Sequence, residues 1–523
     1  MAPRRLLLAV LAYGALNAIL YAGLLPLWDG FDEPFHYAYV SRLWREQRWP
    51  RVGTATLSEE IAESLELAPG SYLVKRNIPA VIPFNDYFTR TDAERKELRR
   101  RLEHIDPRRA AVPGGGFNYE AQQAPLAYVL LAPFDMLWRD TSLVDRILRL
   151  RIFCGLLSAI ATGLLVYRLG GQIGLGDRWR ASAVYLALSS QVFYAATAHV
   201  ANDWLAVPLF TALIVCAISL WDTPTPRKAA WFAAVFAAGL LTKAYFLSVA
   251  PGVAIFAVLL VWRRRLPWGR AGLYAAVPLL LAIAWYARNV VLYRDVSGIL
   301  QTEGGIPVGR LLQAAVRMPW LKSLQVTIAT SLWFGNSSAT HFSAKTTAFL
   351  SILLVAAGLL YAGTLRRRWW PAAERILVAA LLCYSAGLGY SALLHFLTTN
   401  AGMFWAAPWY TQLLFPPGLC LIMAGLARAG RVGEWVRVAM LAGWGYLMAA
   451  TYVAKLIPQY AGYAAERIHF SELLHWYRES LAGADRVLAT VALIPPGAIW
   501  GLTAIVVASA LGLALALSLR FSA

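Results

Sequence analysis

The chain has 523 residues, of which 59% are hydrophobic and only 15% are charged, and its mean hydropathy is +0.52. Soluble globular proteins carry about 25% charged residues, so this composition excludes an ordinary soluble protein and indicates a chain embedded in a membrane. The net charge of +19 does not indicate nucleic-acid binding, because the Lys and Arg residues stand mostly in short clusters between apolar runs. Clusters of that kind orient membrane helices and contact anionic membrane lipids.

The first apolar run covers residues 6–27 and is long enough to cross a bilayer. About 20 helical residues span the roughly 30 Å of hydrocarbon. The basic start, MAPRR, places this end in the cytoplasm under the positive-inside rule. The run is too long for the apolar part of a signal peptide, so we expect an uncleaved first span. The polar stretch WDGFDEPFHY, residues 28–37, then lies on the external side.

A long polar segment, residues 28–148, follows the first span. Two patterns in it, TLSE at 56–59 and TDAE at 91–94, match the helix capping box and predict helix starts. The PGGG sequence at 113–116 is a candidate flexible hinge. Residues 124–138 are short and flanked by Pro, which favours a helix lying along the membrane surface.

Eleven more apolar runs predict further spans. They cover residues 148–169, 181–198, 203–220, 229–242, 245–262, 271–291, 345–364, 374–396, 407–427, 434–454 and 497–519. With loops on alternate sides, the basic clusters of the short loops all fall in the cytoplasm, as do both termini. We therefore predict an all-α polytopic membrane protein with about 12 transmembrane helices and a helical external first loop. The run at 229–242 is short, so it is expected to be tilted, re-entrant or packed behind its neighbours.

Polar side chains stand at the predicted external ends of the spans, where they can converge on one cavity. They are Asp32, Glu33, His36, Glu120, Gln122, Gln123, Arg149, Arg151, His199, Asn202, Asp203, Lys243, Arg288 and Asn289. Ionisable residues at membrane depth cost about 2.5 to 3.5 kcal/mol each on insertion scales, so they tend to be paired, water-lined or functional.

Asp32 and Glu33 are adjacent, so on a helix they point about 100° apart and are expected to have different roles. One can act as general base toward an acceptor hydroxyl, while the other braces the loop or meets a cation. Helix capping or loop solvation is the alternative for the pair. For Asp203, capping of the fourth span is favoured over catalysis.

The candidate cations also allow two interpretations. Lys243, in LLTKAYFL, has no acidic neighbour in the sequence, so it is either functional or a helix-end lysine that reaches the interface. Arg149 and Arg151 either bind substrate or anchor the helix at the interface. Metal binding is open, because the His residues are scattered and no HExxH or Cys/His cluster occurs. A divalent cation held by carboxylates, Mg or Mn, is an option that the sequence does not require.

Six motifs in order resemble the GT-C superfamily of glycosyltransferases, and most closely bacterial members related to protein mannosyltransferases and lipid A aminoarabinose transferases. They are DEPFHYAYV at 32–40, YEAQQAPLAYVLLAP at 119–133, ANDWLAV at 201–207, LLTKAYFL at 240–247, WYARNVVLYRD at 285–295 and WYTQLLFPPGL at 409–419. Many members have His-Pro-Pro at the position of Gln123-Ala124-Pro125, and some have an Arg at Thr411 or Gln412. These departures leave the donor sugar and the acceptor open.

The resemblance implies a multi-pass enzyme of the bacterial inner (plasma) membrane, with its active site on the periplasmic or extracellular face. It would take a sugar from a polyprenyl-phosphate carrier and pass it, with inversion, to an envelope glycan, lipid or protein. The implied catalytic residue is Asp32, with Glu33 second. The residues expected to bind the donor phosphate are Lys243, Arg288, Arg149 and Arg151, and those expected to bind substrate are His36, Glu120, Gln122, Gln123 and Asp203.

Residues 1–454 are expected to form the catalytic transmembrane module, and residues 455–523 an external loop with the final span. A multi-span lipid or glycan transporter is the alternative function. It is less favoured because the charges lie at external helix ends rather than at the midplane, and because no internal repeat is visible. A third alternative is a non-catalytic membrane scaffold, in which Asp32→Asn would change nothing but stability.

Overall fold

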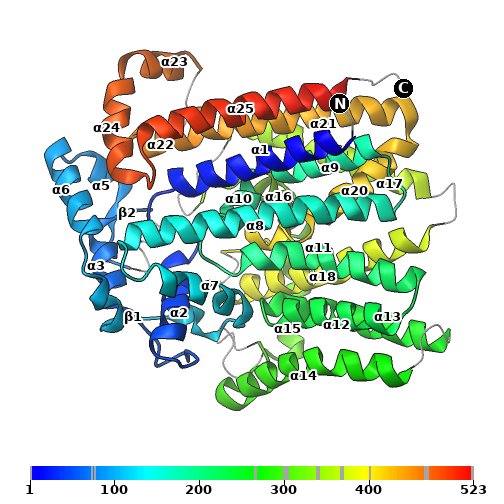
Figure 1. Cartoon of the computed structure of the whole chain (residues 1–523). Coiled ribbons are helices and arrows are strands. Elements are labelled where there is room, and N and C mark those ends of the chain that lie inside the picture. Colours follow the sequence, from blue (N-terminus) through cyan, green and yellow to red (C-terminus); the bar gives the residue numbers. More distant parts are fainter. Residues whose placement is uncertain are drawn as a thin grey trace.

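The computed structural model describes residues 3–71, 75, 78–263, 268–297, 306–336, 342–365, 370–399, 402–463 and 470–519. Long helices lie side by side in a bundle, and a smaller, mixed part sits at one end of it (Figure 1). Nine of the helical segments described are long and apolar enough to cross a membrane. The chain therefore has the all-α polytopic fold predicted from its composition and apolar runs.

The candidate spans follow the predicted runs closely. They are Arg4–Leu24 in α1 (Pro3–Leu24), α8 (Leu143–Gln172), α11 (Asp203–Asp222), η3 with α13 (Ala244–Val249 and Ala250–Trp262), Ala276–Tyr293 in α14 (Trp268–Tyr293), α17 (Ala344–Leu365), α18 (Ala372–Thr398), α21 with η5 and α22 (Gly430–Ala450, Thr451–Leu456 and Ile457–Tyr460), and α25 (Pro496–Ser518).

The other three predicted runs are also helical, but they are short or interrupted. One is divided into α9 (Asp177–Leu188) and α10 (Gln191–Thr197), and another into α19 (Pro408–Thr411) and α20 (Phe415–Arg428). The third is α12 (Pro226–Leu240), whose 15 residues correspond to about 22 Å of helix. That is less than the roughly 30 Å of a bilayer core, as expected for the short run at 229–242.

Close helix packing positions the end of the first span. A Cβ atom at Gly163 of α8 would lie 2.5 Å from a methyl carbon of Leu11, and one at Gly155 would lie 3.1 Å from Ala18. These glycines let α1 and α8 approach closely, as is common for helices in membranes. On its other sides α1 contacts α9 and α25.

The segment between α1 and α8, which is predicted to be external, is largely helical, as expected. It contains α2 (Glu33–Arg45), β1 (Thr56–Ser58), α3 (Glu59–Leu67), β2 (Pro69–Gly70), β3 (Ile82–Pro83), α5 (Phe84–Phe88), α6 (Asp92–Glu103), η1 (Pro107–Ala111), β4 (Pro113–Phe117), η2 (Tyr119–Gln122) and α7 (Leu126–Leu137). The capping box at Thr91 and Glu94 is present at the start of α6. Residues 124–138, which are predicted to form a helix along the membrane surface, contain the helix α7.

Two expectations for this segment are corrected. Thr56 does not cap a helix, because it lies in β1, and Ser58 instead caps α3 by accepting from the Ile61 amide. The PGGG sequence is not a free hinge, since it forms β4 and pairs antiparallel with β1. A Cβ atom at Gly114 would lie 2.5 Å from the Glu59 backbone nitrogen, so close strand approach explains this glycine.

The segment between α1 and α8 and the segment before α25 lie at the same end of the molecule (Figure 1). The helix α24 (Leu481–Val491) lies beside α6 and contacts it, and α23 (Phe470–Glu479) contacts α24. The start of α1 and the end of α25 lie at the opposite end (Figure 1). The remaining helices are α15 (Val308–Arg317) and α16 (Trp320–Leu332).

Candidate functional site

The turn between α1 and α2 holds Asp32 in a strained conformation. Asp32 precedes the first residue of α2, and its φ of 54° and ψ of 17° lie in the left-handed region. A non-glycine residue there costs on the order of 1 to 3 kcal/mol, and such strain clusters at functional sites. The Asp32 side chain makes no capping hydrogen bond to α2, which excludes the capping alternative for this residue. Its carboxylate instead accepts a hydrogen bond from the Tyr119 hydroxyl.

The surroundings of Asp32 favour a role as a base. Its side chain reaches solvent, yet protein surrounds it on most sides, and this burial raises its pKa. The Tyr119 hydrogen bond and the charge of Lys243 lower the pKa, whereas the charge of Asp203 raises it, and the net direction is upward. A carboxylate with a raised pKa is a stronger proton acceptor, as general-base catalysis requires.

Lys243 and Asp203 form a buried ion pair beside Asp32. The Nζ atom of Lys243 lies 2.5 Å from Oδ1 of Asp203, and each residue is 5% exposed. Lys243 also lies over the rings of Tyr245 and Tyr410, at 5.7 and 5.3 Å from their centroids. A buried ammonium does not reach the interface, so that alternative is wrong for Lys243. Asp203 is the first residue of α11, and its carboxylate engages Lys243.

Glu33 and Arg151 form a second buried pair, and its geometry corrects two predictions. Arg151 donates to both Glu33 oxygens and to the carbonyls of Ala22, Leu25 and Pro26. All five guanidinium donors are thereby used, which leaves none for a donor phosphate. Glu33 also accepts from the Val200 amide at 3.0 Å. The pair therefore joins α1, α2 and α8 and is not positioned to act as a base or a phosphate ligand.

A series of hydrogen-bonded polar side chains also belongs to the candidate site. Glu120 accepts from Gln123 at 2.7 Å, and Gln123 accepts from Asn202 at 3.1 Å. His36 bonds the Tyr128 hydroxyl at 2.8 Å, with its Nδ1 atom 3.9 Å from Glu120. Burial and the charge of Asp32 raise the pKa of Glu120 to about 8, and burial lowers that of His36. Both shifts favour the uncharged form of the residue.

The remaining predicted residues are less closely connected to this site. Arg149 is exposed, with its guanidinium 5.6 Å over the Trp138 ring, which fits an interface anchor. Arg288 is half-buried, donates to the Pro50 carbonyl at 3.0 Å and lies 4.5 Å over the Trp285 ring. Gln122 is half-buried at the end of η2. Arg149 is the least suited of these to bind a donor.

Aromatic residues that the sequence reading did not select line the same region. The ring of Phe31 lies 4.5 Å from Trp409 and 6.0 Å from Phe334, measured between centroids. Tyr245 and Tyr410 are 4.2 Å apart and flank Lys243. For Trp409 and Tyr410 the sequence did contain a signal, because these residues begin WYTQLLFPPGL, one of the six motifs that resemble GT-C glycosyltransferases. Such rings offer flat surfaces to the apolar face of a sugar.

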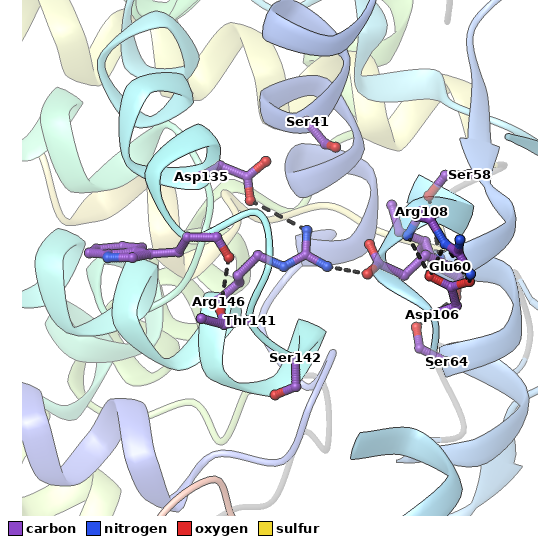
Figure 2. A network of polar contacts seen from close by, with 12 residues as sticks. Ser41, Ser58, Glu60, Ser64, Asp106, Arg108, Asp135, Thr141, Ser142 and Arg146 are labelled. Carbon is purple, nitrogen blue, oxygen red and sulfur yellow. Dashed lines mark hydrogen bonds and ion pairs between the residues drawn. The ribbon is translucent and has the colours of Figure 1, made fainter. Parts of the chain in front are cut away.

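A buried network below α2 was also missed. Figure 2 shows Arg146 of α8 pointing between Asp135 of α7 and Glu60 of α3. Tyr37 of α2 donates to Asp135 at 2.9 Å and accepts from Arg146 at 2.7 Å. Burial raises the pKa of Glu60 to about 7, against the opposing charge of Arg146. The network ties α2 to three other helices and so fixes the helix that directly follows Asp32.

The metal question stays a prediction. In the ranges that the structure describes, no three His, Cys, Asp or Glu side chains are grouped so that they could hold a metal ion. His341, one of the scattered histidines, lies outside the described residues.

Comparisons with known proteins found likenesses in structure but not in sequence. No protein-family model and no curated protein matches the chain. ArnT from Cupriavidus metallidurans, in a structure bound to undecaprenyl phosphate, is similar with a TM-score of 0.43 and 14% identity, over 98% of this chain and 78% of ArnT. The apo structure of ArnT gives a TM-score of 0.36 and 16% identity, over 91% and 75% of the two chains.

The archaeal oligosaccharyltransferase AglB from Archaeoglobus fulgidus, in complex with an inhibitory peptide and a dolichol-phosphate, is similar with a TM-score of 0.36 and 12% identity. The match covers 95% of this chain and 56% of AglB, so the chain spans about half the length of that protein. ArnT and AglB belong to the GT-C superfamily that the six sequence motifs resemble. Because all these TM-scores lie below 0.5, we derive the function from the chain's own residues.

Proposed function

We propose that the chain is an integral membrane glycosyltransferase that moves a sugar from a polyprenyl-phosphate donor to an acceptor on the external face of the membrane. The observation that carries this proposal is the strained, solvent-accessible carboxylate of Asp32, which lies within electrostatic reach of the buried Lys243–Asp203 pair. Transfer of a sugar from a phosphate leaving group needs two groups. One is a base for the acceptor hydroxyl, and the other is a cation for the departing phosphate.

The reaction is a direct displacement. An acceptor hydroxyl gives its proton to Asp32, and its oxygen forms a bond to the anomeric carbon. The bond from that carbon to the phosphate oxygen breaks, and polyprenyl phosphate leaves with the electron pair. A single displacement inverts the configuration at the anomeric carbon.

Lys243 stabilises the departing phosphate. An ammonium has three donors, and one of them is directed at Asp203, so two remain for phosphate oxygens. Arg288 is the second candidate because it is half-buried and lies close enough to Tyr39 to interact with it electrostatically. The raised pKa of Glu120 favours its protonated form, which offers sugar hydroxyls an O–H donor as well as an acceptor. A divalent cation on the carrier phosphate is an additional option that this mechanism does not need.

The orientation follows from charge. The basic start of α1 and the basic clusters of the short loops lie in the cytoplasm under the positive-inside rule, which places Asp32 outside. The alternative, a transporter, would carry its charges at the midplane. Here Asp32, Lys243 and Asp203 all stand at helix ends.

The test is a reaction in lipid nanodiscs. Purified protein is given a panel of polyprenyl-phosphate sugars and a crude envelope extract as acceptor, and release of polyprenyl phosphate is measured. We expect release from one donor that depends on the acceptor. A transporter would instead move an intact donor across sealed vesicles without releasing polyprenyl phosphate, and that result would refute the proposal.

A further inference from the structure

An apolar cavity lies away from the candidate site, between α11, α12, α13 and α18. Its volume is about 290 Å³, and its walls are almost entirely aliphatic and aromatic, with Arg263 and Arg375 as the charged exceptions. Ala379 of α18 lies in the wall with its side chain exposed. A cavity of this character suits a hydrocarbon chain.

The two ends of the cavity can be told apart by the residues that line them. Val249 lines it near the end of η3, and Arg263 lines it at the end of α13, so the two positions are separated by roughly 20 Å of helix. Arg375 stands in the first turn of α18 and lines the cavity together with Arg263. Both arginines therefore mark the end remote from Lys243, which precedes η3. The positive-inside rule places that remote end at the cytoplasmic leaflet.

The two arginines have no acidic partner among the side chains whose positions are described. Glu374, the neighbour of Arg375, is engaged by Arg428, whose Nη1 atom lies 3.0 Å from a Glu374 oxygen. Arg263 lies over the Trp221 ring at 5.2 Å and is exposed. Two uncompensated guanidinium groups at the mouth of an apolar cavity attract a phosphate at the membrane surface.

We propose that this cavity binds an anionic phospholipid of the cytoplasmic leaflet. One acyl chain enters between α11, α12, α13 and α18, and the headgroup phosphate lies on Arg263 and Arg375. The lipid is distinct from the sugar donor, because the donor phosphate belongs at Lys243, at the other end of these helices. This site goes beyond the proposed function. The lipid would pack against α11, which begins at Asp203, and against α13, which is joined to Lys243 through η3.

The first experiment measures binding to the complete wild-type protein. Native mass spectrometry after purification in mild detergent is used to titrate phosphatidylglycerol against phosphatidylcholine. We expect one phosphatidylglycerol per chain to be retained at least tenfold more strongly than phosphatidylcholine. Equal retention of the two lipids would overturn the proposal. Displacement of phosphatidylglycerol by an equal amount of polyprenyl phosphate would also overturn it, since the cavity would then belong to the donor.

The second experiment places the site. Thermal unfolding is followed in micelles with added phosphatidylglycerol, for the Arg263→Gln/Arg375→Gln variant and for a matched Arg431→Gln control. Arg431 is also exposed and basic, but it does not line the cavity. We expect the lipid to raise the Tm of the wild type and the control, and not that of the double variant. A single Ala379→Phe variant, which fills the cavity and keeps both charges, should also lose the shift. An undiminished shift in both variants would refute the assignment.

Discussion

At the scale of single residues, Asp32 combines backbone strain with a tuned proton affinity. Its left-handed conformation is one that Asp and Asn adopt more readily than other non-glycine residues. Asn at this position is therefore compatible with the turn and removes only the charge. The Tyr119 hydroxyl is the neighbour that most directly stabilises the Asp32 carboxylate.

Replacing Tyr119 with Phe should move the pH profile of the reaction. The Tyr119 hydrogen bond lowers the pKa of Asp32, so its loss raises that pKa further. The base form is lost as the pH falls through the pKa, and the acidic limb of kcat/KM should therefore shift to higher pH in Tyr119→Phe. Tyr87→Phe, a buried tyrosine of α5 that bonds the Thr490 carbonyl, is the control. An unchanged limb in Tyr119→Phe would remove Asp32 from the base role.

Substitutions in the Lys243–Asp203 pair should affect the stability of the protein and its binding of the donor in different ways. Lys243→Ala leaves a buried carboxylate unpaired, which costs about 3 to 5 kcal/mol of unfolding free energy. Lys243→Ala with Asp203→Ala removes that penalty, and stability should recover. Donor binding should stay weak in both variants, because the cation for the phosphate is absent. Calorimetry and a donor titration measure the two quantities, and restored binding in the double variant would contradict the phosphate role.

The sequence did not predict which polar side chains pair with one another. The cluster of polar residues at external helix ends was recognisable, and it contains Asp32, Lys243 and Asp203. The partners were not, since Lys243 and Asp203 are 40 positions apart and Arg151 and Glu33 are 118 apart. The saturation of Arg151 depends on carbonyls at the end of α1, and these become acceptors only once the helix stops there.

At the scale of elements, hydropathy located the helices well and their interruptions poorly. Every apolar run is helical, yet the run at 181–198 breaks between α9 and α10, and the run at 407–427 restarts at α20. Apolar composition does not register such breaks, because Ser and Pro are tolerated in membrane helices. Pro416 and Pro417 stand in the first turn of α20, where a missing amide donor is harmless.

The β1–β4 pair makes a prediction for one glycine. Gly114→Ala would bring a Cβ atom to 2.5 Å from the Glu59 backbone nitrogen, which cannot move without opening the strand pair. We expect a loss of about 1 to 3 kcal/mol in local stability, seen as faster hydrogen exchange over residues 56–58 and 113–117. Gly309→Ala, in α15 with open space around it, is the control and should be neutral or stabilising. Unchanged exchange in Gly114→Ala would show that the strands separate readily.

At the scale of the whole molecule, the arrangement concentrates chemistry at one end of the bundle. The segment between α1 and α8 meets α24 at this end, through contacts between α6 and α24. The Asp32 turn, the Lys243–Asp203 pair and the Glu120 chain lie where these parts join the spans. Arg263 and Arg375 line the apolar cavity at its end remote from Lys243.

The orientation of the molecule is testable with single cysteines. Two exposed positions are suitable. Asp140 lies in the turn between α7 and α8, and Asp222 lies at the end of α11, so the variants are Asp140→Cys and Asp222→Cys. An impermeant maleimide should label Asp140→Cys in intact cells and Asp222→Cys only after permeabilisation. The four native cysteines lie in helices and are buried or half-buried, which keeps the background low. The reverse pattern would place the Asp32 site in the cytoplasm.

The most direct measurement is a single-turnover assay of Asp32→Asn beside the wild type, once the donor is known, with donor binding measured on the same preparations. Loss of general-base catalysis predicts a rate lower by about 10² to 10⁴, with the donor dissociation constant and Tm nearly unchanged. Asp140→Asn, which changes an exposed carboxylate outside the site, should react at the wild-type rate. A folded Asp32→Asn protein that transfers sugar at the wild-type rate would contradict the central claim, that Asp32 is the base of a membrane glycosyltransferase.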